Sequence, residues 1–275
     1  MNATQPTRPH FSRPPIHEQA IALGFERLPD FDIVDHGLFW NLIKDQFPQA
    51  DTAARSPQAT ELFEGSDGQL SLNVVPSAML ARSLFKNAEA GELVQLQDNL
   101  FAFNWIRESS KVEYPRFERT SARCWELYDQ YINYFANRYG RPPQLRQCEL
   151  TNINIIPVED FGASFEALEQ IFKVDPFAWN VPGLVAETYV RRRQHKMVGE
   201  DGAPIGRLHS VISPMFGPGG EQLFQFELTA RSAPAIGSKD RAVEFFNAAH
   251  DMINGAFLAS VTSRARKHWG EYDGK

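Results

Sequence analysis

The chain has 275 residues, of which 43% are hydrophobic and 23% charged, with a net charge of -6 at pH 7. This is ordinary globular composition, and the length suits one large domain or two of moderate size. Binding to a nucleic-acid backbone needs clustered Lys and Arg, so the acidic balance argues against a nucleic-acid partner. Because no stretch approaches the roughly 18 apolar residues that span a bilayer, we expect no membrane insertion.

The two cysteines, Cys124 and Cys148, lack metal-ligand spacing and cannot form a disulfide framework. Both are expected to be reduced and structural, as in a cytosol. The first residues are polar and lack the apolar run of a signal peptide. The sequence therefore predicts a cytoplasmic protein with a disordered tail over residues 1–13.

The sequence pattern of the first half predicts several strands, one short helix and one long helix. Asp35 is a candidate N-cap because Phe39, Ile43 and Phe47 follow at fourfold spacing. Asp98-Asn99 is a plausible hairpin turn. The expected elements are a strand over 16–25, a helix over 37–47, a loop over 49–66, strands over 69–75, 92–97 and 100–105, and a helix over 115–139.

The second half repeats this order. The expected elements are a strand over 148–156, a helix over 165–172 capped by Ser164, strands over 184–198, 205–212 and 223–231, and a long helix over 239–268. The fold class of the whole chain is therefore predicted as α+β, with an antiparallel sheet covered by helices on one face. Residues 14–142 and 143–275 form two similar units, and the order is comparable to that of TATA-binding proteins.

Three motifs occur in order along the chain. They are Pro14-Pro15-Ile16 leading to Glu18, Leu93-Val94-Gln95-Leu96 leading to Asn104-Trp105, and Glu149-Leu150 leading to Ile153-Asn154. In this order they resemble a sporadically distributed family of uncharacterised bacterial proteins. The chain departs from the family pattern at Gln19, where Ala is usual, and at Asn152, where an aromatic residue is common. The resemblance implies no activity. The patchy distribution of the family implies an accessory role in defence or toxin neutralisation.

Two glutamates, Glu18 and Glu149, fall near the start of the first strand of each unit. A carboxylate in an apolar strand is costly to bury unless it is paired. A pseudo-twofold axis would allow the two to meet, and together they would hold a metal or share a proton. The alternative is that both lie at strand ends and face solvent or an arginine.

Asparagines are depleted in strands, yet Asn104, Asn152 and Asn154 all lie in predicted strands. Asn152 and Asn154 share one sheet face because side chains alternate along a strand. They would contact a ligand or partner, or else satisfy loops and helix ends inside the protein.

The segment from Arg191 to Lys196 is the clearest charge signal in the chain. On a strand, Arg191, Arg193 and His195 face one way. They would contact an anion or an acidic partner, or simply protect a solvated sheet edge from aggregation.

Three functions remain open. The favoured one is a non-catalytic interaction protein that binds a protein partner, since G-x-S-x-G, Walker and dinucleotide loops are all absent from the sequence. The second is a sensor that binds a nucleotide or metabolite between the sheet and the long helices, through Arg191, Arg193, Asn152 and Asn154. The third is a metal-dependent hydrolase or nuclease that uses Glu18 and Glu149. No cofactor is expected, and a homodimer is left open.

Overall fold

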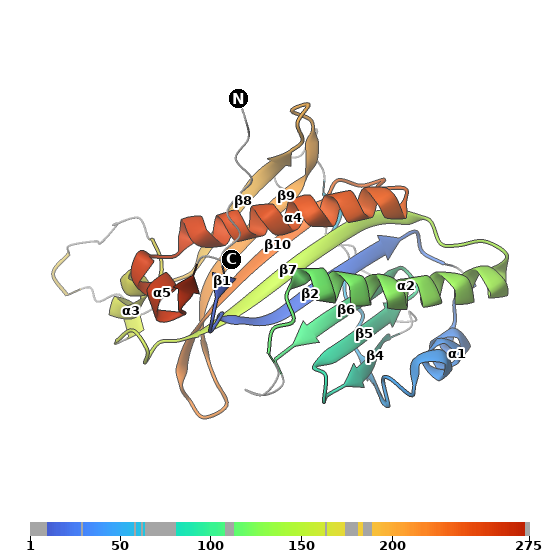
Figure 1. The fold of residues 1–275 in the computed structure, drawn as a ribbon, viewed down its shortest axis with the longest axis horizontal. Coiled ribbons are helices and arrows are strands. Elements are labelled where there is room, and N and C mark those ends of the chain that lie inside the picture. Colours follow the sequence, from blue (N-terminus) through green and yellow to red (C-terminus); the bar gives the residue numbers. More distant parts are fainter. Residues whose placement is uncertain are drawn as a thin grey trace.

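The computed structural model describes residues 10–28, 30–57, 59–61, 63, 81–107, 113–162, 164–173, 181–183 and 189–272. Its centre is a nine-stranded sheet in which every neighbouring pair is antiparallel, ordered β3-β4-β5-β6-β2-β7-β10-β9-β8 (Figure 1). The α+β class is therefore confirmed. The strands are β2 (Ile16–Phe25), β3 (Gln49–Ala53), β4 (Arg82–Asn87), β5 (Glu92–Gln97), β6 (Leu100–Ile106), β7 (Leu145–Pro157), β8 (Arg191–Val198), β9 (Pro204–Phe216) and β10 (Gln222–Ser232).

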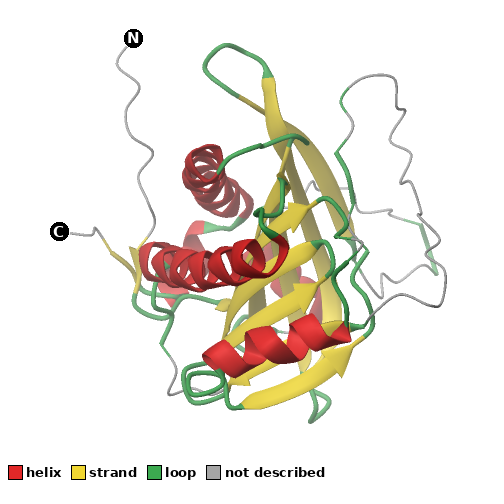
Figure 2. Ribbon diagram, turned by 90° about the vertical axis from the view of Figure 1, so that its right-hand side faces the viewer, coloured by secondary structure: helices red, strands yellow, loops and turns green. Residues whose placement is uncertain are grey.

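Helices cover one face of this sheet, which we call the helix face (Figures 1 and 2). They are α1 (Ile33–Ile43), α2 (Phe117–Tyr139), α3 (Ser164–Ile171), α4 (Lys239–Ser260) and α5 (Ser263–His268). Aromatic side chains fill the space between the layers, with Phe101 of β6 stacked on Tyr131 of α2 at 5.5 Å between ring centroids. On the α4 side, Phe226 of β10 stacks on Phe257 at 5.9 Å. Burial of these rings supplies the main driving force for packing the helices on the sheet.

Strand β2 is the middle strand of the nine, and it pairs with β7 over most of its length. Strand β2 also pairs with β6, and β7 also pairs with β10. Both strands are covered on the helix face, where Ile21 and Leu150 are fully buried. Polar residues on this face of β2 and β7 therefore lie deep in the molecule.

Most predicted elements are confirmed, including the hairpin of β5 and β6 through Asp98-Asn99. Helix α1 begins four residues earlier than predicted, because Asp32 and not Asp35 is its N-cap. Asp35 occupies position N3 and completes a capping box with Asp32. The predicted last helix is interrupted at Val261 and Thr262, where Thr262 caps α5 and Val261 bridges to Phe172.

The predicted tail is wrong for residues 10–13. Strand β1 (His10–Phe11) pairs antiparallel with β11 (Glu271–Tyr272), so the two ends of the described chain lie side by side. Ser12 and Arg13 continue the pairing through backbone hydrogen bonds to Gly270 and Trp269. Residues 49–53, expected in a loop, form the edge strand β3. The strand predicted over 69–75 and residues 184–188 lie outside the described residues.

No helix in the described part of the chain is long and apolar enough to cross a membrane. Both cysteines are free and buried, and burial raises the pKa of each thiol well above its ordinary value. Their thiols are therefore inert at neutral pH, in agreement with a structural role.

Candidate ligand-binding site

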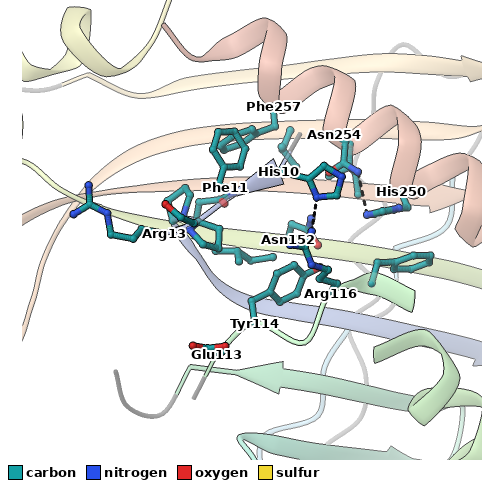
Figure 3. A pocket seen from close by; sticks show the side chains of 18 of the residues that line it. His10, Phe11, Arg13, Glu113, Tyr114, Arg116, Asn152, His250, Asn254 and Phe257 are labelled. Atoms are coloured by element: carbon teal, nitrogen blue, oxygen red, sulfur yellow. Dashed lines mark hydrogen bonds between the residues drawn. The ribbon is translucent and has the colours of Figure 1, made fainter. Parts of the chain in front are cut away.

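A cavity of about 770 Å³ lies on the helix face, between the N-terminal end of α2, the middle of α4 and the central strands (Figure 3). This volume is in the range that holds a small organic ligand. Strands β7 and β10 provide its floor, and residues 10–16 close one side. Helix α2 from the first half of the chain and helix α4 from the second half both contribute to it.

The floor of the cavity carries two buried asparagines, Asn152 and Asn154, which are 7% and 4% exposed. Asn154 Nδ2 donates to the carbonyl oxygen of Phe226 at 3.0 Å. Asn152 Oδ1 accepts from Gln19 Nε2 at 2.9 Å. Within the described chain, Asn152 Nδ2 donates to no residue and Asn154 Oδ1 accepts from none. Neither of these two atoms is fully enclosed, so water can satisfy each of them until a ligand in the cavity replaces it.

Gln19 fixes the orientation of Asn152. Its amide nitrogen also donates to Tyr114 Oη at 2.8 Å, and its carbonyl oxygen accepts from the Thr120 hydroxyl. Gln19 is completely buried, so its two donors and its acceptor are used inside the protein. The Asn152 amide is therefore held with its nitrogen available to the cavity.

Two arginines, Arg107 and Arg116, line the cavity without a carboxylate partner in the described part of the chain. Arg107 donates to the carbonyl oxygen of Pro14 at 3.2 Å, and burial lowers its pKa from the ordinary value. Arg116 donates to His10 Nδ1 at 2.6 Å (Figure 3). It also donates to Tyr272 Oη at 2.9 Å. Arginine remains charged in such surroundings and readily binds carboxylate or phosphate.

The rim of the cavity is mixed in charge. Arg13 also lines it, as do the carboxylates of Glu113 and Glu118. Three arginines line the cavity against two glutamates, so the lining carries a small net positive charge although the whole chain is acidic. The acidic rim would discriminate between anions by where their negative groups lie.

Aromatic rings form the wall toward α4. His250 stacks on Phe117 with ring centroids 4.2 Å apart and planes inclined by 16°. Its Nε2 hydrogen-bonds the side chain of Asn254 at 3.0 Å. Phe257 and Phe11 also line the cavity, with their ring centroids 5.9 Å apart. These largely buried rings pack on one another and make this side of the cavity largely apolar.

The predicted carboxylate pair does not come together. Glu18 and Glu149 point to the open face of the sheet, opposite the helices. The register places Ala22 opposite Glu149. Glu18 therefore lies four positions along β2 from the partner position of Glu149, which is roughly 14 Å along the strand. A site made jointly by these two glutamates is contradicted.

Glu18 instead pairs with the predicted residue Asn104. Asn104 Nδ2 donates to Glu18 Oε1, and Gln95 Nε2 donates to Asn104 Oδ1 at 2.7 Å. Burial raises the pKa of Glu18, and the hydrogen bond from Asn104 opposes this increase. Asn104 therefore satisfies a buried carboxylate and does not line the cavity.

Glu149 belongs to a second polar network on the open face. Arg231 forms two ion pairs, one from Nη2 to Glu149 Oε2 at 2.6 Å and one from Nη1 to Glu61 Oε1 at 2.9 Å. His209 Nε2 contacts Glu61 at 2.6 Å, and Arg207 pairs with its other oxygen. Glu61 is only 4% exposed, so this network anchors its segment to β9 and β10. We call it the Glu61 network.

The basic residues of β8 lie at the far edge of the sheet. Arg191 is buried and donates to the carbonyl oxygen of Lys173 at 3.0 Å. Arg193 and His195 are exposed. None of the three lines the cavity, so among the predicted contact residues only Asn152 and Asn154 do.

Sequence reasoning missed Gln19, Arg107, Arg116 and His10. One signal was present, since Gln19 is a polar residue at a core-facing position of an apolar strand. Arg116 gave a further signal only in the structure, where it has a positive φ of 71° before α2. Within the described residues, no group of three His, Cys, Asp or Glu side chains is placed to hold a metal ion.

No protein-family model, curated protein or solved structure matches this chain. The resemblance to a bacterial family therefore stays a prediction from its three motifs. The cavity has to be interpreted from its own chemistry.

Proposed function

We propose that this protein is a binding protein for a small anionic ligand, held in the cavity between α2, α4 and β7. One observation carries the proposal. Within the described chain, each asparagine amide on the cavity floor keeps one atom without a protein partner, and the arginines on the wall have no carboxylate partner. A ligand with matching groups would satisfy both sets on binding.

The lining indicates the class of ligand. Asn152 offers N–H donors, Asn154 offers a carbonyl acceptor, and Arg107 and Arg116 offer a positive charge. The aromatic wall of Phe117 and His250 suits a flat ring. A nucleotide combines these features, because its base has donors and acceptors on a ring and its phosphate is anionic. We therefore propose a nucleotide or a similar phosphorylated heterocycle, and a sensor role.

Thermal unfolding with ATP, GTP, AMP, UMP and citrate tests this proposal. A ligand at 100 times its Kd stabilises by about 2.7 kcal/mol, which raises the Tm of a chain this size by about 5–10 °C. At least one nucleotide should produce such a shift, and citrate should not. Arg116→Gln should abolish the shift, whereas Arg119→Gln, which changes an exposed arginine in the first turn of α2, should retain it.

Two results would contradict the proposal. One is that no compound in the panel changes the Tm. The other is that the same shift persists in Arg116→Gln and in Asn152→Leu, which would place the ligand elsewhere.

A second candidate function is binding of a protein partner at the β8 edge. Strand β8 pairs with β9 alone among the described strands, and residues 192–196 are exposed on both faces. An acidic extended segment could add to this edge through backbone hydrogen bonds and opposite charge. Pairing of β8 with a second copy is disfavoured, because Arg and Lys would face like charges.

Native mass spectrometry of the untagged protein from its host tests this second candidate. A co-purifying protein of tens of kilodaltons that is lost on changing Arg192 and Lys196 to Glu would support it. A bare chain, or a partner retained by that variant, would exclude the β8 edge. The defence or toxin-neutralising role inferred from the family resemblance stays a prediction.

The two halves are proposed to be related by duplication. Strand order supports this, since β2 and β7 are each followed by a short helix, further strands and a long helix. Around the β2–β7 pair, β6, β5 and β4 correspond to β10, β9 and β8. This order resembles the saddle of TATA-binding proteins in topology alone. The cavity would then lie where the two units meet.

A further inference from the structure

Helix α1 is apolar on its outer side as well as its inner side. Phe39 and Ile43 are buried against the sheet, whereas Val34, Leu38 and Leu42 are 52%, 42% and 54% exposed. A surface helix normally carries polar residues on the side that faces water. Ile33 at the start of the helix is also 64% exposed. An apolar cluster of this kind on a surface helix marks an interaction site.

The exposed residues form a regular stripe. Val34, Leu38 and Leu42 recur every four residues, so they lie on one line along the helix. Gly37 lies beside Leu38 on the exposed side, and a Cβ added there would meet nothing within 4 Å. A glycine inside a helix costs about 1 kcal/mol relative to alanine. Its use here leaves a depression next to Leu38 that an inserted side chain can fill.

We infer that this stripe is the interface of a homodimer, in which α1 packs antiparallel against α1 of a second copy. The stripe is symmetric about Leu38, since Val34 and Leu42 lie four residues to either side. A twofold axis at Leu38 would place Val34 against Leu42 of the partner subunit. The same side chains would then be covered in both copies, as a closed symmetric dimer requires.

The charges at the helix ends fit this arrangement. The first turn is preceded by Asp32 and the last turn is followed by Lys44, and both are exposed. Antiparallel packing brings the Lys44 end of one helix beside the Asp32 end of the other. The helix dipoles also oppose each other in this orientation. A parallel arrangement would bring like ends together, which favours the antiparallel pair.

The position of α1 leaves room for a second copy. It lies at one end of the helix layer, away from α4, and its outer side faces away from the sheet (Figure 2). Within the described residues, nothing covers the stripe. This interface is distant from the cavity, so dimer formation and ligand binding are separate inferences.

Light scattering coupled to size exclusion, over a series of protein concentrations, tests the dimer. Wild type should be a dimer at tens of micromolar. Leu38→Asp should weaken association by at least about 100-fold, because two carboxylates would face each other at the twofold axis. The matched control is Phe216→Asp, which removes a 70% exposed ring at the end of β9 and should leave the dimer intact. Circular dichroism verifies that both variants fold.

A disulfide test identifies the geometry. Leu38→Cys should form an intermolecular disulfide on mild oxidation, and Phe216→Cys should not. The native cysteines do not interfere, because Cys124 and Cys148 are buried. A monomeric wild type, or a dimer that Leu38→Asp leaves unchanged, overturns the inference. So does a dimer in which Leu38→Cys fails to cross-link.

Discussion

The two faces of the sheet carry buried polar clusters of opposite character. On the open face, the Glu61 carboxylate is contacted by Arg207, His209 and Arg231, so opposite charges meet within the protein. On the helix face, the amides of Asn152 and Asn154 each keep one group without a partner in the described chain. A cluster whose polar groups are all paired stabilises the fold, whereas a cluster with unpaired groups can bind a ligand.

Glu61→Gln should have the largest effect on stability. It leaves the two arginines and His209 around an uncharged amide, and breaking a buried ion pair costs about 3 kcal/mol or more. Chemical denaturation should show a free energy of unfolding lower by about 3 kcal/mol. Glu126→Gln, which removes an exposed partner of Arg123, should change it by less than about 0.5 kcal/mol. Equal effects would mean that the Glu61 network is not a structural anchor.

The destabilisation caused by Glu61→Gln should depend on pH. Burial alone would raise the pKa of Glu61, but its hydrogen bond with His209 and the nearby positive charges lower it overall. With a folded-state pKa below the unfolded value of about 4.3, its contribution is complete above that pH and is lost as pH falls through the folded pKa. The difference between wild type and Glu61→Gln should therefore shrink from pH 5 to pH 3. A difference that grows in this range would contradict the sign of the shift.

Asn152→Leu should show the reverse pattern, with a small effect on stability and a large one on binding. Gln19 loses one acceptor and keeps Tyr114, which costs about 1 kcal/mol of unfolding free energy. The Kd of the nucleotide identified by thermal unfolding should rise at least about tenfold. Calorimetry on Asn133→Leu, an exposed asparagine of α2, provides the control. Unchanged affinity in Asn152→Leu would separate the open amides from the ligand.

Glu18→Gln should have the smallest effect and the opposite sign to Glu61→Gln. Burial raises the pKa of Glu18, so the folded state favours the protonated acid and loses stability as pH rises through the folded pKa. Removing the charge at pH 7 should stabilise the protein, by less than about 1 kcal/mol, and the gain should vanish near pH 4. Destabilisation at pH 7 would show that the Asn104 hydrogen bond outweighs burial.

Local patterns predicted the elements well where short-range chemistry decides them. The stripe of Phe117, Cys124 and Tyr128 defines α2, and Asp98-Asn99 defines the β5–β6 turn. The start of α1 was misplaced because Asp32 and Asp35 both resemble caps, and only the capping box distinguishes them. Strand β3 has no apolar alternation, and its pairing with β4 comes from distant sequence.

The candidate site was predicted only in part. Alternation along β7 correctly placed Asn152 and Asn154 on one face, which the cavity uses. The contact of Arg116 with His10 spans 106 residues and that with Tyr272 spans 156, so no local pattern contains them. The Glu18–Glu149 hypothesis failed because it rested on symmetry without the register that sets their separation.

The pairing of His10 with Tyr272 brings the two ends of the described chain to one place on the surface. A short peptide linker could therefore join them, and new ends could be opened at the turn between β8 and β9, where Asp201 and Gly202 are exposed. Such a circular permutant would keep every strand neighbour of the nine-stranded sheet. It would also make β1 and β11 an internal hairpin at the border of the cavity, which frees both chain ends for tags and immobilisation far from the ligand.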